Sequence, residues 1–487
     1  MRPFLAHPFD SDKLHEECGI FGMIGAADAA NFVALGLHAL QHRGQEAGGI
    51  VSYDPATGFN SARRFGYVRD NFTNAEVMKT LPGQLAIGHV RYSTAGNKGA
   101  TAIRDVQPFF GEFSMGGSAI AHNGNITNAL ALRKELIERG SIFQSSSDSE
   151  CIIHLMARSM GRNIPDRMEE ALRKVEGAFS IVAMTRSKLM GVRDPLGVRP
   201  LVLGKLGDGY ALSSETCALD IIGAAFIREI EPGEMVVISA ENGVESHFPF
   251  RRVKSRSCIF EHVYFSRPDS ILGGRSIYET RRQIGVELAR EAPVDADLVC
   301  PVPDSGTPAA IGFSQESGIP YAMGIIRNQY MGRTFIEPTE QIRNMGVRLK
   351  LNVNRALIKG KRVILVDDSV VRGTTSRKIK DMIIDAGAAE VHFRIASPPT
   401  AWPCFYGVDT PERSKLLAAT MTEAEMCAWI GVDSLKFVSL DGLYRAAGEA
   451  SGRDAKAPQY CDACFSGEYP VSPSDMIEKG FEMKAAE

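Results

Sequence analysis

Cys18, in the run Glu-Glu-Cys-Gly-Ile-Phe-Gly, has the chemistry of a nucleophile. A free thiol has a pKa near ~8.5, so little thiolate exists at neutral pH unless a base is close. If the chain were cut before Cys18, the new α-amino group, with a pKa of ~7.7–8.0, would be a better base than a lysine near ~10.4. A lone cysteine can also be a small buried hydrophobic residue, so this interpretation needs support from other segments.

Four polar segments that each follow an apolar stretch provide that support. An amide substrate needs a thiolate, hydrogen-bond donors for the oxyanion, and charged partners for its α-amino and α-carboxylate groups. Asn123 and Gly124 could donate a side-chain and a backbone N–H to the oxyanion. Arg91 could bind the carboxylate as a bidentate partner, and Asp148 could bind the ammonium. The four segments are 42–46 (His-Arg-Gly-Gln-Glu), 89–94 (His-Val-Arg-Tyr-Ser-Thr), 122–125 (His-Asn-Gly-Asn) and 147–150 (Ser-Asp-Ser-Glu).

In this order after Cys-Gly-Ile, the segments resemble the class II glutamine amidotransferases, which are N-terminal nucleophile hydrolases. The resemblance covers about residues 18–250 and implies a four-layer αββα sandwich that hydrolyses glutamine to glutamate and ammonia. It also implies that residues 1–17 are a propeptide whose removal exposes Cys18. The alternative, an N-terminal segment that stays attached, would leave Cys18 without its α-amino group.

A second kind of chemistry is indicated where the apolar run 363–366 delivers two adjacent carboxylates, Asp367 and Asp368. A turn of small residues then opens onto a helix, whose first N–H groups and hydroxyls would bind a phosphate. The carboxylates suit sugar hydroxyls and a hydrated Mg²⁺. An acidic pair or a Gly-Thr-Thr turn is weak evidence alone, but the two at this spacing are specific. The turn consists of Ser369, Val370, Val371, Arg372, Gly373, Thr374 and Thr375.

This stretch resembles the phosphoribosyl pyrophosphate motif of the type I phosphoribosyltransferases. The resemblance implies that the ribose hydroxyls lie against Asp367 and Asp368, that the 5′-phosphate lies in the turn, and that Ser305 joins the two carboxylates around Mg²⁺. Segment 327–350 would be a flexible loop that closes over the substrate; the alternative is an ordinary surface excursion. The expected pyrophosphate loop, less rich in hydroxyls than is typical, comprises Asp304, Ser305, Gly306 and Thr307.

Four cysteines could bind a metal centre. Cys461 and Cys464 form a CxxC, which alone could be redox-active, half of a zinc site, or chance. With Cys258 and Cys404 the set could bind Zn²⁺ or an iron–sulfur cluster, and spacing does not decide between them. The sequence contexts of Cys258 and Cys404 resemble those of cluster-bearing amidophosphoribosyltransferases, which implies a [4Fe–4S] cluster.

Two kinds of element are expected to position these residues. Before residue 250, short apolar runs separated by turns predict strands at 84–89, 118–122, 180–184 and 235–238. A helix is predicted between Asp28, its N-cap, and Gly44, its stop. Its apolar face would comprise Phe32, Leu35, Ala39 and Leu40.

After the charged junction 251–256, strands and helices alternate. A helix capped by Ser276 is followed by strands at 298–302, 363–366 and 391–396, which predicts a parallel sheet covered by helices on both faces. Ligands of such sheets bind beyond the carboxyl ends of the strands. We therefore expect an α/β and α+β protein whose domains are 18–250 and 257–467, followed by a tail at 468–487.

The composition is that of an ordinary soluble globular protein of 487 residues, with 44% apolar and 23% charged residues. A net charge of 55 − 58 = −3, without a basic block, argues against nucleic acid as a partner. No apolar run is long enough to span a membrane, and residues 1–17 do not resemble a secretory signal. The odd number of cysteines, nine, fits a reducing cytoplasm.

The combined features resemble the amidophosphoribosyltransferase family over about residues 17–467. The resemblance implies that glutamine and phosphoribosyl pyrophosphate yield phosphoribosylamine, glutamate and pyrophosphate, the first committed step of purine synthesis. It implies one Mg²⁺ and one [4Fe–4S] cluster per subunit, purine nucleotide inhibitors, and a homodimer or homotetramer. There are two alternative functions. The first is that of another class II amidotransferase, which would not need the motif at 367–375. The second is that of a regulatory protein that senses phosphoribosyl pyrophosphate, which would not need a glutaminase.

Overall fold

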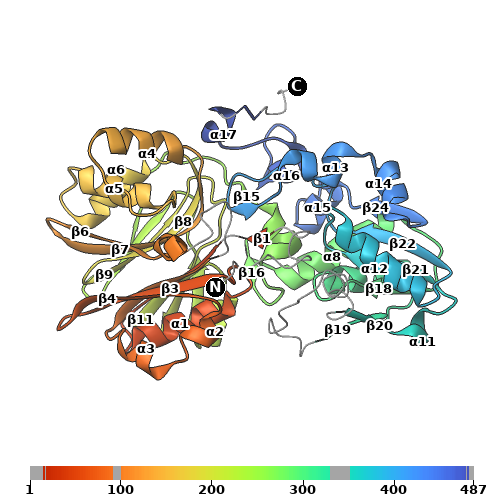
Figure 1. The fold of residues 1–487 in the computed structure, drawn as a ribbon, viewed down its shortest axis with the longest axis horizontal. Coiled ribbons are helices and arrows are strands. Elements are labelled where there is room, and N and C mark those ends of the chain that lie inside the picture. The colour runs from red at the N-terminus through yellow and green to blue at the C-terminus, as the bar shows by residue number, and fades with distance from the viewer. Residues whose placement is uncertain (1–14, 17, 92–99, 329–350, 479, 482–487) are drawn as a thin grey trace.

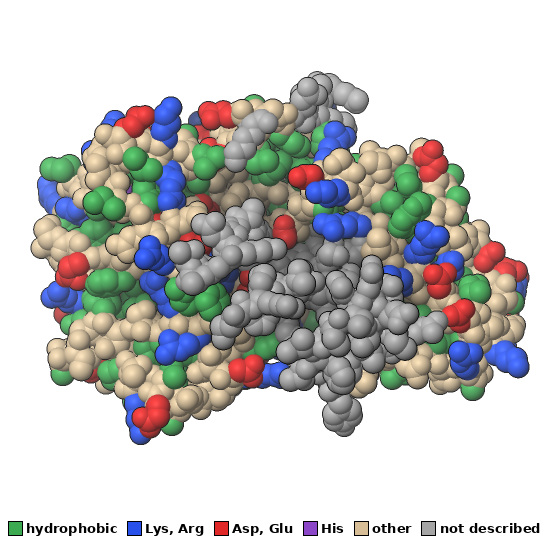
Figure 2. Space-filling model, in the orientation of Figure 1, with side chains coloured by type: hydrophobic (Ala, Val, Ile, Leu, Met, Phe, Trp, Pro, Cys, Tyr) green, Lys and Arg blue, Asp and Glu red, His purple; other side chains and the backbone are tan. Residues whose placement is uncertain are grey.

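The computed structural model describes residues 15–16, 18–91, 100–328, 351–478 and 480–481. The chain forms two halves that lie side by side, with the earlier part of the sequence in one and the later part in the other (Figure 1). On the face shown in Figure 2, side chains of both charge signs are interspersed over both halves. Within the described residues, no helix has the length and hydrophobicity needed to cross a bilayer.

The first half contains a seven-stranded antiparallel sheet in the order β12-β10-β11-β2-β5-β3-β4. One of its faces is covered by helices α1 (Ala29–Ala39) and α7 (Cys217–Ile221), with the short helices α2 (Val68–Asn71) and α3 (Ala75–Lys79) at its edge. The strands are β2 (Cys18–Ile24), β3 (Ala47–Asp54), β4 (Gly58–Phe65), β5 (Leu85–Arg91), β10 (Val202–Leu206), β11 (Gly209–Ser213) and β12 (Ala225–Glu229).

A second, six-stranded sheet packs against the other face of the first through a layer of buried apolar side chains. Its outer face is covered by α4 (Ala129–Glu138), α5 (Glu150–Arg158) and α6 (Ile164–Leu172). The four layers confirm the predicted αββα sandwich. In sheet order, the strands are β14 (Gly243–His247), β13 (Met235–Ser239), β9 (Lys188–Arg193), β8 (Gly177–Met184), β7 (Gly116–Ile126) and β6 (Phe109–Phe113).

The helix predicted from Asp28 exists, but its predicted end is wrong and its predicted face is only partly right, since Ala39 and Leu40 are buried as expected. Val33 and Leu37 are buried, whereas Leu35 is 46% exposed. The helix ends at Ala39, and Gly44 serves another purpose, since a Cβ there would lie 2.6 Å from the backbone N of Arg91. The buried face is set by the sheet beneath the helix, which a local apolar pattern does not specify.

The second half contains a parallel sheet in the order β18-β21-β22-β24, as predicted. Its strands are β18 (Leu298–Pro301), β21 (Arg362–Asp367), β22 (Glu390–Ile395) and β24 (Ser434–Phe437). Ile364 packs toward α8 (Ile277–Glu291) and α9 (Thr307–Ser317), and Leu365 packs toward α12 (Thr374–Asp385) and α14 (Glu423–Ile430). Ser276 caps α8 by accepting the N–H of Glu279 at 3.3 Å.

The two halves share one apolar core, which includes Ala178 and Val198 from the first and Phe260 from the second. The C-terminal tail returns to the first half, where Asp475 accepts the N–H of Leu130 at the start of α4 at 2.7 Å. The remaining elements of both halves are short. They are β1 (His15–Glu16), η1 (Ala100–Asp105), β15 (Ser257–Cys258), η2 (Glu261–Phe265), β16 (Ile271–Leu272), β17 (Arg275–Ser276), β19 (Ile325–Arg327), β20 (Leu351–Val353), α11 (Arg355–Ile358), β23 (Val408–Asp409), η3 (Arg413–Lys415), α13 (Leu417–Thr420), α15 (Leu440–Ala446), β25 (Tyr460–Cys461), α16 (Ala463–Ser466) and α17 (Ser474–Glu478).

Candidate active sites and the cysteine cavity

Cys18 is the first residue of β2 and is buried. It pairs with Arg91, the last residue of β5, so the predicted nucleophile and the predicted carboxylate-binding residue are direct cross-strand partners. Two hydrogen bonds hold the strand on its other side: Ile20 N–H donates to Ser214 Oγ, and Ser214 N–H donates to the Ile20 carbonyl, both at 3.1 Å. Of the expected propeptide 1–17, only β1 lies within the described residues, and it pairs with β23.

Asn123 and Gly124 lie on β7, which packs against β2 and β5 across the sandwich. Asn123 is fully buried, and neither atom of its side-chain amide has a hydrogen-bond partner among the described residues. A buried amide without a partner costs ~1–3 kcal/mol, so this side chain is suited to a ligand. Gly124 has φ +141°, and a Cβ there would lie 2.0 Å from the Ala178 carbonyl oxygen, so no other residue fits.

The side chains of Asp148 and Arg91 are only partly buried. The Asp148 side chain is 24% exposed, although its carboxylate accepts the N–H of Ile126 at 2.9 Å and that of Ser149 at 2.7 Å. Those bonds hold Asp148 beside the end of β7. The Arg91 guanidinium lies 3.7 Å from the Asp105 carboxylate. Residues 92–94 of the predicted segment lie outside the described residues.

Asp367 ends β21, and Asp368 follows it; both are buried. Asp367 Oδ1 accepts the N–H of Asp368 at 2.9 Å, and Asp368 Oδ2 accepts the Ser369 hydroxyl at 2.6 Å. The turn then enters α12 at Thr374, with Gly373 in the left-handed conformation as its N-cap. The first N–H groups of a helix lack intrahelical partners, which makes this end suited to an anion.

The loop that contains Ser305 lies at the same edge of the sheet, because Pro301 of β18 pairs with Val366 of β21. A Cβ on Gly306 would lie 2.2 Å from the Val366 carbonyl oxygen, so the loop rests directly on the strand that delivers Asp367. Asp304 forms an ion pair with Arg327. The predicted pyrophosphate loop and acidic pair are therefore neighbours, while most of the predicted closing loop, 329–350, lies outside the described residues.

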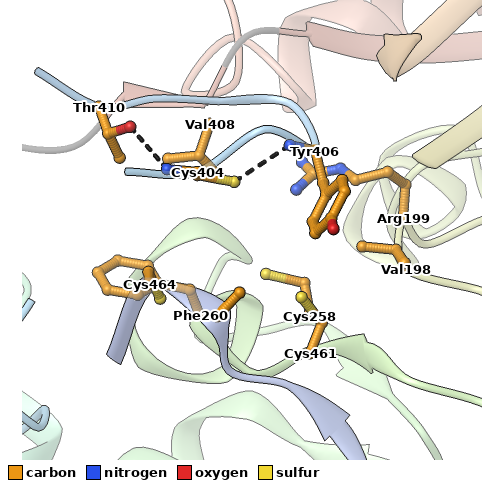
Figure 3. A pocket seen from close by; sticks show the side chains of 11 residues that line it. Val198, Arg199, Cys258, Phe260, Cys404, Tyr406, Val408, Thr410, Cys461 and Cys464 are labelled. Atoms are coloured by element: carbon orange, nitrogen blue, oxygen red, sulfur yellow. Dashed lines mark hydrogen bonds between the residues drawn. The ribbon is translucent and has the colours of Figure 1, made fainter. Parts of the chain in front are cut away.

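The four predicted cysteines line one cavity of about 20 Å³ (Figure 3). Cys258 and Cys461 are adjacent through the pairing of β15 with β25, and Cys404 faces them across the cavity. Cys404 Sγ accepts the N–H of Tyr406 at 3.3 Å. Burial raises the pKa of Cys258 to about 12. Within the described residues, no three His, Cys, Asp or Glu side chains converge as ligands of a single ion.

The Cys404 loop also contacts the first half, which sequence analysis did not predict. Asn125 Nδ2 donates to the Phe405 carbonyl at 2.9 Å. A Cβ on Gly407 would lie 2.9 Å from the Cα of Gly124. The cysteine cavity is thus connected to the strand of Asn123 and Gly124 by a single loop. No sequence motif predicts this contact, because Asn125 and Phe405 are 280 positions apart in the chain.

Comparison with known proteins identifies both halves. Residues 96–220 match the glutamine amidotransferase domain family. The chain is 55% identical to the amidophosphoribosyltransferase of Rhizobium etli, over 95% of this chain and 94% of the relative. It is 45% identical to that of Bacillus subtilis, over 94% and 95%.

A solved structure agrees over nearly the whole chain. It is the B. subtilis glutamine phosphoribosylpyrophosphate amidotransferase complexed with ADP and GMP, with a TM-score of 0.87 at 43% identity. The match covers 94% of this chain and 98% of that one. The chain therefore belongs to the amidophosphoribosyltransferase family.

Proposed function

We propose that this chain performs its family's reaction with Cys18 as nucleophile and with Asp367 and Asp368 at the ribose. The reaction transfers ammonia from glutamine to 5-phosphoribosyl 1-pyrophosphate and yields 5-phosphoribosylamine, glutamate and pyrophosphate, the first step of purine synthesis. The observation that carries the assignment is the cross-strand pairing of Cys18 with Arg91, with the unpartnered Asn123 amide on the strand that packs against them.

In the first half, removal of residues 1–17 would give Cys18 a free α-amino group, which takes the thiol proton. The thiolate attacks the glutamine amide carbon, and the Asn123 amide and the Gly124 N–H stabilise the oxyanion. The C–N bond then breaks, the α-amino group returns the proton to the departing ammonia, and water hydrolyses the thioester. Arg91 and Asp148 would hold the α-carboxylate and the α-ammonium of glutamine.

In the second half, Asp367 and Asp368 would bind the ribose hydroxyls, and residues 369–375 would bind the 5′-phosphate. Residues 304–307 would bind the pyrophosphate. Ser305, Asp367 and Asp368 would hold one hydrated Mg²⁺, an oxygen set that this ion prefers. When bound, Mg²⁺ would neutralise charge on the departing pyrophosphate. Ammonia would reach this site through an apolar passage, since water would protonate it.

We also propose one [4Fe–4S] cluster per subunit, held by Cys258, Cys404, Cys461 and Cys464. The four thiols surround a shared cavity, and the sequence contexts of Cys258 and Cys404 resemble those of cluster-bearing relatives, which supports a cluster over zinc. When bound, the cluster would cross-link β15, β25 and the Cys404 loop. Protein purified without oxygen should be brown and contain iron and sulfide, and Cys404→Ser should lose the colour. A colourless protein loaded with zinc would contradict the proposal.

Regulation and assembly follow the family. We propose inhibition by purine nucleotides, because the B. subtilis relative was solved with ADP and GMP. We propose a homodimer or homotetramer that acts in the cytoplasm. In the part of the chain that the structure describes, which includes all nine cysteines, none forms a disulfide, as a reducing compartment requires.

Glutamate release from glutamine, measured with and without phosphoribosyl pyrophosphate and Mg²⁺ on protein purified without oxygen, tests the assignment. We expect strong stimulation by phosphoribosyl pyrophosphate, loss of all release in Cys18→Ala, and a mature chain whose mass begins at Cys18. Release that persists in Cys18→Ala would overturn the nucleophile. Release that ignores phosphoribosyl pyrophosphate would contradict coupled sites.

A further inference from the structure

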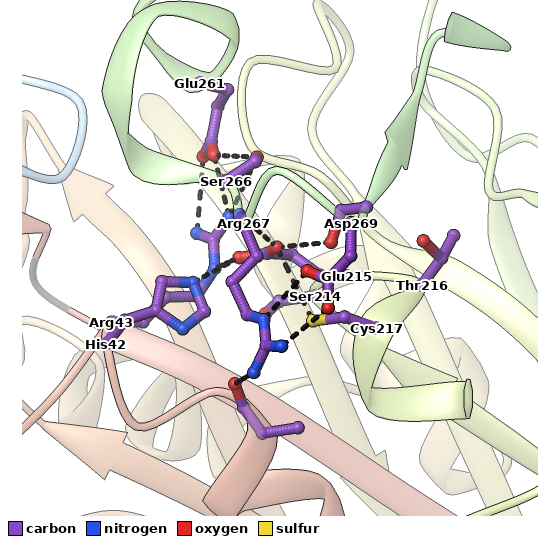
Figure 4. Close-up of polar contacts among 12 residues, drawn as sticks. His42, Arg43, Ser214, Glu215, Thr216, Cys217, Glu261, Ser266, Arg267 and Asp269 are labelled. Atoms are coloured by element: carbon purple, nitrogen blue, oxygen red, sulfur yellow. Dashed lines mark hydrogen bonds and ion pairs between the residues drawn. The ribbon is translucent and has the colours of Figure 1, made fainter. Parts of the chain in front are cut away.

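A cluster of buried charges joins the two halves of the molecule (Figure 4). Arg43 and Glu215 come from the first half and Glu261 from the second, and all three are at most 3% exposed. The Arg43 guanidinium forms an ion pair with Glu215 and donates to Glu261 Oε2 at 2.7 Å. Arg199 lies 3.2 Å from Glu261 Oε1. The motifs of neither active site include Glu215 or Glu261.

The cluster reaches the nucleophile strand in two ways. Glu215 directly follows Ser214, whose two hydrogen bonds to Ile20 lie two residues from Cys18. Gly44, next to Arg43, lies close against the backbone of Arg91, because a Cβ on Gly44 would lie 2.6 Å from the backbone N of Arg91. A shift of Arg43 or Glu215 therefore moves backbone on both sides of the Cys18–Arg91 pair.

The cluster reaches the phosphoribosyl half through the segment 266–270. The Glu215 carboxylate accepts the Arg267 N–H at 2.8 Å and the Ser270 hydroxyl at 2.6 Å. Arg281 of α8 donates to the Ser266 carbonyl at 2.7 Å. Helix α8 rests directly on α9, because a Cβ on Gly312 would lie 1.8 Å from the Arg282 carbonyl oxygen, and α9 begins at Thr307 in the predicted pyrophosphate loop.

Polar contacts and the backbone between them thus lead from Arg281 of α8 to Ile20, and the packing of α8 on α9 extends this path to the predicted pyrophosphate loop. Burial alone would raise the pKa of Glu215, yet Arg43 and His42 hold it well below its usual range, so Glu215 stays charged. Buried ions tolerate few arrangements, because separating them leaves an uncompensated charge in a medium of low dielectric. A network of this kind passes between discrete arrangements instead of deforming gradually.

We propose that Glu215 is a positioning residue that couples occupancy of the phosphoribosyl pyrophosphate site to the alignment of the Cys18 strand. The inference rests on the proposed assignment of the two sites. Binding of pyrophosphate at residues 304–307 displaces α9 and the α8 helix packed on it, and segment 266–270 carries the displacement to Glu215. Linkage makes the binding part of this coupling reciprocal: any factor by which phosphoribosyl pyrophosphate tightens glutamine binding is also the factor by which glutamine tightens phosphoribosyl pyrophosphate binding.

The test compares Glu215→Gln with Glu234→Gln on the full-length mature enzyme. Glu234 is a matched control, because it is equally buried and pairs with Arg228 at 2.6 Å, away from the cluster that joins the halves. The measurements are glutamate release with and without phosphoribosyl pyrophosphate, product formation with ammonium as the nitrogen source, and the Kd for phosphoribosyl pyrophosphate by calorimetry.

We expect Glu215→Gln to lower the stimulation of glutamate release at least about tenfold, within the range of ~5–150-fold typical of allosteric coupling. Basal release, the ammonium-dependent rate and the Kd should stay within about twofold, and Glu234→Gln should keep full stimulation. Unchanged stimulation in Glu215→Gln would overturn the inference while leaving the proposed function intact. The inference would also be overturned if phosphoribosyl pyrophosphate did not stimulate glutamate release in the unmodified enzyme. Failure of the proposed function would be seen separately, as glutamate release that persists in Cys18→Ala.

Ser270→Ala decides the question if Glu215→Gln fails to fold. It removes one neutral hydroxyl that donates a hydrogen bond to Glu215, and it leaves every buried charge in place. Hydrogen exchange of residues 18–24 provides a second readout. Addition of phosphoribosyl pyrophosphate and Mg²⁺ should change protection of this strand in the unmodified enzyme, and the change should shrink in Ser270→Ala. An equal change in both proteins would refute the role of Glu215.

Discussion

Gly407→Ala should impair the glutaminase half although Gly407 lies in the second half of the chain. The new Cβ would lie 2.9 Å from the Cα of Gly124, whereas carbon atoms in good contact are ~3.5–4.0 Å apart. The Cys404 loop and β7 must therefore separate by roughly 0.6–1 Å. A misplacement of ~1 Å can cost ~100-fold in rate. We expect kcat/KM for glutamate release to fall about 10- to 100-fold.

The same substitution places alanine at φ +99°, which itself costs ~1–3 kcal/mol of stability. Gly58→Ala is the matched control, because Gly58 has φ +79° and nothing lies within 4 Å of its added Cβ. It should lose stability but keep glutaminase activity. Product formation from ammonium should stay near normal in both variants, and iron content should be measured alongside. Glutaminase activity in Gly407→Ala within twofold of the unmodified enzyme would show that the Cys404 loop does not position β7.

Three further predictions concern buried polar groups. Asn123→Ala should lower kcat for glutamate release by about 10²–10³-fold, because it removes a donor to the oxyanion. The unfolding midpoint should not fall, because the Asn123 side chain has no hydrogen-bond partner to lose among the described residues. A change confined to KM would contradict the assigned role. Glu261→Gln should cost ~3–5 kcal/mol in urea unfolding, since it leaves buried arginine charge uncompensated, whereas Glu279→Gln, at a side chain 56% exposed, should cost ~0–1 kcal/mol. Burial alone would raise the pKa values of Glu215 and Glu261, but the nearby arginines hold them below the usual value of ~4.3. The two carboxylates therefore stabilise the folded protein fully above that pH, and this stabilisation is lost as the pH falls below it. Urea unfolding between pH 3 and 6 should therefore show a shallower acid loss in Glu261→Gln than in the unmodified enzyme, and equal slopes would contradict the assignment.

Much of each site is readable from the sequence, because its parts are contiguous. The run from β21 through Asp367 to α12 is one strand, one turn and one helix, and each is specified by residues within a few positions. The cap at Ser276, which was predicted, is local in the same sense, and so is the left-handed Gly318 that ends α9. The four-layer arrangement of the first half followed from family resemblance and not from the strand pattern alone.

Tertiary structure decided what lies beside each of these parts. The face that α1 buries depends on the sheet beneath it, so the local pattern misassigned Leu35. The shared cavity of Cys404 and the CxxC arises from segments that meet only after folding, and so does the burial of Asn123 without a partner among the described residues. Arg43 contacts Glu215 and Glu261 across 172 and 218 positions of chain. Such contacts follow no sequence period, because they depend on how the two halves of the chain pack together around a shared core.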